Sequence, residues 1–157
     1  DEIIPYVLEQ DVEDLLRSFK IDVRIIGEEY KNVDFTGKEY CTEKGIEIHV
    51  RSAFLQGLFY IEEAKLKNYF NDVVPYIRIL RSLAQENGVT LAELSLLWLV
   101  SLEEVSKVII GIDNVNQLEQ HLETLEKNVD PIVFEEVLSI NYENEQILNP
   151  SLWPSTF

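Results

Sequence analysis

The sequence predicts an α/β fold in which the strands pair in parallel. Short segments with strand patterning alternate with segments of helical periodicity, and the connections between the strands are long. The last predicted strand is apolar at successive positions, as strands covered on both faces tend to be. The chain has 157 residues, which suits one domain of ordinary size, so we expect residues 1–157 to form a single domain.

The first part of the chain predicts a helix, a strand, a polar stretch with one short helix, and a second strand, over residues 11–19, 21–26, 27–45 and 46–50. Apolar side chains in the first helix recur at a spacing that places them on one face: Val12, Leu15, Leu16 and Phe19. In the second strand Ile48 and Val50 share one face, and Glu47 and His49 share the other.

The middle of the chain predicts two long helices. The first covers residues 73–84 and is stopped by Gly88. Thr90 and Glu93 form a capping box that starts the second. Residues 94–100 are apolar on nearly all sides, so we expect this helix to be deeply buried, with Trp98 in the core. Ser101 and Glu104 repeat the capping-box spacing and predict one further short turn.

The last part of the chain predicts a strand over 107–110, helices over 115–127 and 131–140, and a tail over 143–157 without periodicity. The helix at 131–140 has Asp130 as its cap and Pro131 at its first position. The helix at 115–127 carries an apolar face formed by Val115, Leu118, Leu122 and Leu125. A complete (β/α)₈ barrel takes about 250 residues, so a chain of this size supplies only a few of its units.

Composition and charge exclude several classes of partner. The chain has 29 acidic and 13 basic residues and a formal charge of −16, which repels nucleic acids and anionic membranes. No apolar run reaches the about 20 residues of a membrane-spanning helix, and no signal segment opens the chain. The single cysteine, Cys41, excludes an internal disulfide and suits a cytoplasmic protein. The chain opens on Asp1 and contains no methionine, so we expect it to be a piece of a longer translation product.

Three stretches together resemble the aldo-keto reductase family: GIEIHVRSAFLQGL at 45–58, VTLAELSLLWLVS at 89–101 continuing to VIIGIDNVNQLEQHL at 108–122, and ILNPSLWP at 147–154. The resemblance covers residues 45–154 and extends more weakly to residues 11–26. It implies a partial (β/α)₈ barrel, the TIM-barrel fold, with roughly the last three βα units followed by C-terminal helices and the tail.

The resemblance implies an oxidoreductase that reduces carbonyl compounds with a nicotinamide cofactor, NADH or NADPH. The Asp, Tyr, Lys and His residues that carry catalysis in this family lie on earlier strands, which are missing here. The chain therefore lacks the general acid that protonates the carbonyl oxygen, and we expect no reductase activity from it in isolation. It would serve as the C-terminal, cofactor-binding segment of such an enzyme.

The loop VRSAFLQGL resembles the family loop after the seventh strand, which has Ser-Pro-Leu and then Gly three residues on. Ser52 and Gly57 match that pattern, Ala53 replaces the Pro, and Phe54 takes the Leu position. The resemblance implies that Ser52, with small neighbours and backbone N–H groups, holds the cofactor pyrophosphate, and that Phe54, Leu55, Gln56 and Gly57 cover it. The alternative is a tight corner packed on neighbouring helices.

The segment after the eighth strand resembles the part of the family that holds the adenosine end of the cofactor. Many members have Lys-Ser before the helix and an Arg in its first turn, where this chain has Gly111, Ile112 and Gln117. The Glu-Asn pair that contacts adenine becomes Gln120 and His121. The lost cations predict a preference for the unphosphorylated cofactor, or no cofactor binding.

Further departures and candidates leave alternatives open. Residues 21–27 lack the Gln-Pro-Asn with which the sixth strand of the family commonly ends. His49 is interpreted as a paired structural histidine rather than a catalytic one, and no metal-ligand spacing is present. Trp153 either borders a substrate pocket or docks the tail. The second functional hypothesis is a non-enzymatic interaction or scaffold module, with self-association or the missing N-terminal half as its partner.

Overall fold

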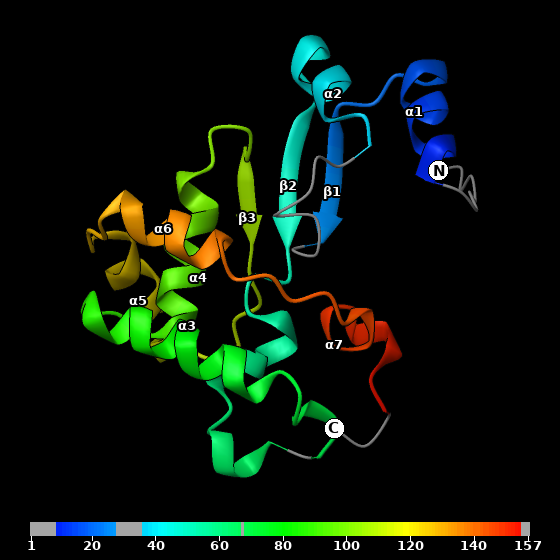
Figure 1. Ribbon diagram of the computed structural model, residues 1–157. Coiled ribbons are helices and arrows are strands. Elements are labelled where there is room, and N and C mark those ends of the chain that lie inside the picture. Colours follow the sequence, from blue (N-terminus) through cyan, green and yellow to red (C-terminus); the bar gives the residue numbers. More distant parts are fainter. Residues whose placement is uncertain (1–8, 28–35, 67, 155–157) are drawn as a thin grey trace.

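Three strands form a fully parallel sheet in the order β1-β2-β3, and their arrowheads all point to the same end (Figure 1). They are β1 (Val23–Gly27), β2 (Glu47–Arg51) and β3 (Lys107–Ile109). This computed structural model describes residues 9–27, 36–66 and 68–154. The predicted α/β class and the parallel pairing are confirmed. Residues 28–35 of the predicted polar stretch and 155–157 of the tail lie outside the described residues.

The predicted helices are confirmed with small shifts at their ends: α1 (Glu9–Ser18), α2 (Lys38–Lys44), α3 (Val74–Glu86), α4 (Leu91–Ser101), α5 (Val115–Leu125) and α6 (Pro131–Leu138). A further helix, α7 (Glu145–Leu148), lies in the tail, where the sequence predicts none. Gly88 follows α3 with a φ of +72°, a conformation that costs glycine little. The Asp130 carboxylate caps α6 by accepting a hydrogen bond from the Ile132 backbone N–H at 3.0 Å. Within the described residues, no helix is both long enough and apolar enough to cross a membrane.

One face of the sheet packs against helices. Ile48 and Val50 of β2 lie in a buried cluster with Leu16 of α1, Cys41 of α2 and Trp98 of α4. Helix α4 is hydrophobic on all sides, as its sequence predicts, because it lies between this cluster and two others. Its N-terminus has the predicted capping box, in which the Thr90 and Glu93 side chains each accept a hydrogen bond from the other residue's backbone N–H.

The opposite face of the sheet is uncovered by the described residues. Val23 is 41% exposed, Ile25 57% and Ile109 44%. Their register partners are Glu47, His49 and Arg51, so all of them point away from the buried row of β2. The prediction that the third strand is covered on both faces is therefore wrong. Strand β3 lies at the edge of the sheet, and its apolar run reflects Val108 on the packed face and Ile109 on the open one.

One further expectation needs correction, and one predicted feature has an unexpected environment. Ser101 does not cap a new turn, because it is the last residue of α4 and its hydroxyl donates to the Trp98 carbonyl oxygen at 2.7 Å. Glu104 instead pairs with Lys38 across 2.8 Å. The predicted apolar stripe on α5 is present but exposed to solvent, since Val115 is 69% and Leu122 55% exposed, and the buried residue of this helix is Thr124.

The tail docks against the segment before α3. The Trp153 indole N–H donates to the Ile147 carbonyl oxygen at 3.0 Å, and its ring packs edge-to-face on Phe70 with centroids 5.0 Å apart. The Tyr142 hydroxyl donates to Asp72 at 2.9 Å. Of the two roles considered for Trp153, the structure supports docking of the tail.

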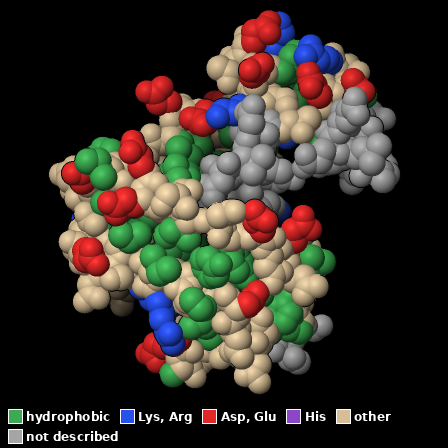
Figure 2. Space-filling view, in the orientation of Figure 1, with side chains coloured by type: hydrophobic (Ala, Val, Ile, Leu, Met, Phe, Trp, Pro, Cys, Tyr) green, Lys and Arg blue, Asp and Glu red, His purple; other side chains and the backbone are tan. Residues whose placement is uncertain are grey.

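The chain carries more acidic than basic side chains, 29 against 13. Figure 2 shows acidic side chains distributed over the face seen in Figure 1, with hydrophobic side chains gathered over its helical part. This distribution agrees with the formal charge of −16.

Candidate cofactor site

The loop after β2 has an unusual backbone. Ser52, Leu55 and Gln56 have φ values of +66°, +45° and +51°, and Gly57 has a φ of +86°. Residues other than glycine rarely adopt this region, at a cost of about 1–3 kcal/mol each. The loop also follows the carboxyl end of a parallel strand, where ligands of α/β proteins bind. Three strained residues at this position mark the loop as a candidate site.

Contacts from α4 and within the loop hold this backbone in place. The Ser95 hydroxyl donates to the Ala53 carbonyl oxygen at 2.7 Å, and both residues are buried. The Leu55 N–H donates to the Ser52 carbonyl and the Gly57 N–H to the Phe54 carbonyl, both at 2.9 Å. Leu55 is 6% exposed and points into a core cluster. These contacts are those expected of the alternative reading of this loop, a tight corner packed on neighbouring helices.

The loop contacts the helix after β3 through stacked rings. The Phe54 and His121 rings are nearly parallel, with centroids 5.2 Å apart and an interplanar angle of 9°. The Tyr60 ring packs against Phe54 at the same centroid distance and an angle of 67°. This contact joins the two segments that the family resemblance assigns to the cofactor.

A cavity of about 660 Å³ adjoins the rings. Its lining comes from the segment after the loop, the α3–α4 corner and α5: Phe59, Tyr60, Glu62, Arg81, Gln85, Val89, Thr90, Leu91, Ala92, Glu93, Gln120, His121 and Thr124. Of the predicted site residues, the structure brings only Gln120 and His121 to this cavity. Phe54 does not line the cavity but stacks on the ring of His121, which does. The other predicted residues lie outside the lining: Ser52, Leu55, Gln56, Gly57, Gly111, Ile112 and Gln117.

The charges at the cavity are largely paired. Burial by itself would raise the pKa of Glu93, but hydrogen bonds from Lys127 and from the Thr90 backbone outweigh it and hold this pKa below its ordinary value. Burial raises the pKa of Tyr60, and the negative charge of Glu93 raises it further. The Arg81 guanidinium donates to the Ile61 carbonyl oxygen. The paired groups give the cavity no concentrated positive charge to attract a phosphate.

Neutral side chains cap the N-terminus of α5. The Asn114 side chain accepts a hydrogen bond from the Gln117 N–H at 3.0 Å, and the Gln117 side chain accepts one from the Asp113 N–H at 2.7 Å. A helix N-terminus binds anions through such free N–H groups. Here the Asn114 side chain takes one of them, the N–H of Gln117, and the neighbouring Gly111 and Ile112 are exposed without a charge.

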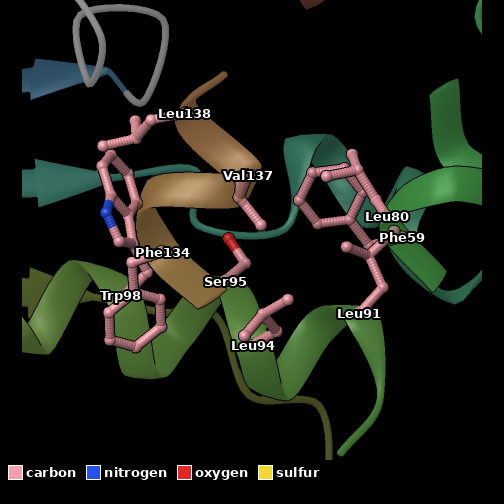
Figure 3. A pocket seen from close by; sticks show the side chains of 9 residues that line it. All are labelled: Phe59, Leu80, Leu91, Leu94, Ser95, Trp98, Phe134, Val137 and Leu138. Atoms are coloured by element: carbon pink, nitrogen blue, oxygen red, sulfur yellow. The ribbon is translucent and has the colours of Figure 1, made fainter. Parts of the chain in front are cut away.

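A second cavity of about 50 Å³ lies on the other side of Phe59 and Leu91, which line both (Figure 3). Its walls are apolar apart from the Ser95 hydroxyl, whose hydrogen bond to Ala53 already satisfies it. A volume of this size holds about one water molecule, and the apolar walls do not favour one. This apolar pocket is partly open to the surface, where its lining residue Leu138 is 44% exposed.

A separate polar cluster lies on the open face of the sheet. The His49 Nε2 and Lys107 Nζ atoms lie 2.7 and 3.0 Å from the same Glu47 oxygen. The hydrogen bond with His49 and then the one with Lys107 lower the pKa of Glu47. The interpretation of His49 as a paired structural residue agrees with this geometry. Among the described residues, no group of three or more His, Cys, Asp and Glu side chains is arranged to hold a metal ion.

Comparison with known proteins identifies the family. A model of the Aldo/keto reductase family matches residues 10–141. The chain belongs to this family. Among solved structures it is similar to aldo-keto reductase AKR11C1 from Bacillus halodurans in its apo form, with a TM-score of 0.65 and 15% identity over 90% of this chain and 52% of that chain.

The holo form of the same reductase gives a TM-score of 0.61 at 15% identity over 90% of this chain and 51% of that chain. At this identity the likeness concerns the fold alone. The chain spans about half the length of that aldo-keto reductase. A search of curated proteins finds no match to this sequence.

Sequence reasoning missed several residues of this candidate site. Tyr60, Arg81 and Glu93 line the cavity, and Ser95 supports the loop. The aromatic pair Phe59–Tyr60 directly follows the loop and is unusual for a surface segment. It is the sequence feature that could have indicated this part of the site. Arg81 on α3 and Glu93 on α4 come to the site through the packing of these two helices against the segment after the loop, which no local pattern predicts. From the sequence, Glu93 is predicted only to cap the N-terminus of α4.

Proposed function

We propose that this chain is the C-terminal, cofactor-binding segment of an NADH- or NADPH-dependent oxidoreductase that acts on carbonyl compounds. In this proposal the sheet and its helices are the last three βα units of a (β/α)₈ barrel, residues 1–157 are one domain, and residues 143–157 are its tail. Membership in the aldo-keto reductase family and the half-length match to a member support it. The isolated chain is inactive because the family's Asp, Tyr, Lys and His lie on strands outside it.

One observation carries the assignment of the site. The stacked rings of Phe54 and His121 join the strained loop after β2 to the helix after β3, next to a cavity of about 660 Å³. Ligand sites in proteins range from about 300 to 1,000 Å³, so a nucleoside fits this volume. Rings and amide groups at its wall suit a planar base.

The residues present fit the base end of the cofactor better than its phosphates. The N–H groups of Leu55 and Gly57 donate to carbonyl oxygens within the loop, and the first turn of α5 is capped by Asn114 and Gln117. A 2′-phosphate would meet no cation at Gly111 or Ile112 and would lie near Asp113. We therefore propose the unphosphorylated cofactor. When bound, this group supplies the hydride, and the present chain contributes binding and orientation alone.

Titration with NADH and NADPH, followed by cofactor fluorescence, tests the proposal. We expect saturable binding of NADH that is at least tenfold tighter than binding of NADPH. A mixture of the chain with NADH and an aldehyde should give no turnover above the buffer rate. Absence of NADH binding, or turnover at a rate ordinary for enzymes, would each contradict the proposal.

One observation favours a second candidate function, a non-enzymatic interaction or scaffold module. Both outer strands of the sheet have a free edge among the described residues, and apolar side chains are exposed on the open face and along α5. Parallel sheets are almost always covered on both faces, so this surface suits a second copy or a complementary half-barrel. Light scattering distinguishes the cases, because a stable monomer at micromolar concentration counts against a self-associating module.

A further inference from the structure

The tail and the strained loop after β2 share one buried cluster. Leu55 and Leu58 come from the loop and Ile147 comes from α7, which the chain reaches by crossing from α6 as an extended segment (Figure 1). All three side chains are buried. Leu55 has a φ of +45°, and a strained residue keeps such a conformation only where its surroundings fix it. Because Ile147 completes the cluster that buries Leu55, the docked tail stabilises the loop.

A single carboxylate anchors the start of the tail. The Tyr142 hydroxyl and the Asn144 side-chain amide both donate to the Oδ2 atom of Asp72, at 2.9 and 2.5 Å. These hydrogen bonds, first the one from Asn144, hold the pKa of Asp72 below its ordinary value. The Asn144 side-chain oxygen also accepts a hydrogen bond from the Gln146 N–H at 3.1 Å, so the same side chain caps α7. Asp72 therefore fixes the residue from which α7 begins.

The remaining contacts of the tail depend on that start. The Tyr69 hydroxyl donates to the Gln146 carbonyl oxygen at 2.7 Å, and the Trp153 indole N–H donates to the Ile147 carbonyl oxygen at 3.0 Å. Both acceptors are backbone groups of α7, so they are in place only when α7 begins in its observed position. These contacts follow the anchor at Asp72 and do not replace it.

We propose that Asp72 is a positioning residue that anchors the tail and, through the tail, controls the conformation of the strained loop. Release of the tail from Asp72 withdraws Ile147 from the shared cluster and lets Leu55 relax. Phe54 precedes Leu55, and its ring stacks on His121 in the wall of the cavity of about 660 Å³. The state of the tail is therefore transmitted to this wall. The inference concerns the regulation of the cavity and holds for any ligand that the cavity takes.

The variant Asn144→Asp separates the anchor from the helix cap. Aspartate caps a helix as well as asparagine does, so α7 keeps its start, but a second carboxylate then faces Asp72 in place of a donor. In the full chain the NMR signal of the Trp153 indole proton should move, because its hydrogen bond to α7 is lost with the docked tail. The backbone N–H groups of Leu55 and Gly57, which are bonded within the loop, should exchange with solvent about tenfold faster.

Asn149→Asp is the matched control. It makes the same change of charge in the same tail, and it keeps the side-chain oxygen that accepts a hydrogen bond from the Ser151 N–H at 3.1 Å. The indole signal and the exchange of the loop should stay as in the parent chain. Asp72→Asn retains an oxygen for both donors and should keep the tail docked, whereas Asp72→Ala should release it. Should D72A fail to fold, N144D and N149D still decide the question.

Amide exchange in β2 separates the proposed coupling from a general loss of structure, because it should be the same in N144D and the parent chain. Equal acceleration in β2 and in the loop would overturn the inference. So would a released tail with a loop that exchanges at the parent rate, a tail that stays docked in N144D, or His121 ring signals that do not move when the tail is released. None of these measurements uses a ligand, so their outcome is independent of NADH binding and of the proposed function.

Discussion

The Ser95 hydroxyl donates a hydrogen bond of 2.7 Å to the carbonyl oxygen of Ala53 and so ties the most buried helix to the strained loop. Both groups are buried, and Ala53 is 1% exposed. A loop with positive φ values at Ser52, Leu55 and Gln56 relaxes unless its surroundings fix it. The hydrogen bond from Ser95 is one such restraint, because it fixes the backbone beside Ser52.

Replacement of Ser95 by alanine should therefore destabilise the fold. The Ala53 carbonyl would lose its donor in a buried position, at a cost of about 1–3 kcal/mol in the free energy of unfolding. Urea denaturation followed by circular dichroism measures this change. Ser82→Ala is a suitable control, since the Ser82 hydroxyl bonds to Glu86 at an exposed position of α3. Equal midpoints for the two variants would argue against a restraining role of Ser95.

Alanine at Gly57 tests the backbone conformation of the loop. A Cβ at this position meets no atom within 4 Å, so the whole effect comes from the φ of +86°. The left-handed region costs a non-glycine residue about 1–2 kcal/mol, and we expect a loss of this size. Gly111→Ala is the matched control, because its Cβ also meets no atom within 4 Å and its φ is ordinary. A stabilised G57A variant would show that the loop does not need this conformation.

The stability of the fold at acidic pH depends in part on Glu93. Its folded pKa lies below its ordinary value, so its contribution is fully present above the unfolded pKa of about 4.3 and is lost as the pH falls through the folded value. Glu93→Gln should lower the melting temperature at pH 7 and reduce the loss of stability between about pH 5 and pH 3. The exposed Glu119→Gln serves as control. If the stability of E93Q falls with decreasing pH as steeply as that of the wild type, Glu93 does not contribute to this pH dependence.

The sequence predicts most of the architecture because local patterns dominate it. The capping box of Thr90 and Glu93, the Asp130–Pro131 start of α6 and the alternation in β2 are all decided by neighbours within a few residues. Ser101 shows the limit of such patterns. Its spacing to Glu104 fits a capping box, but α4 continues through Ser101, and Glu104 forms an ion pair with Lys38 of α2.

The site is less predictable because it depends on contacts between distant segments. The resemblance identified Phe54 and His121 as members of two separate cofactor loops, yet only the structure places their rings in contact. The cavity wall includes Arg81 of α3, which belongs to no motif. The stripe on α5 was predicted from its period, but periodicity identifies an apolar face without specifying whether another element covers it.

The exposed stripe on α5 yields the last prediction. Leu118 and Leu122 are 41% and 55% exposed, and they lie on one face because they are four residues apart. If the stripe mediates association, the double variant L118E/L122E should shift the chain toward monomer in light scattering, because charge on an apolar contact is costly to bury. Its melting temperature at low concentration should change little, since neither side chain is buried in the fold. Leu152→Glu is the matched control, because Leu152 is 53% exposed on the tail, away from the stripe. A monomeric parent chain, or equal association in all three proteins, would contradict the prediction.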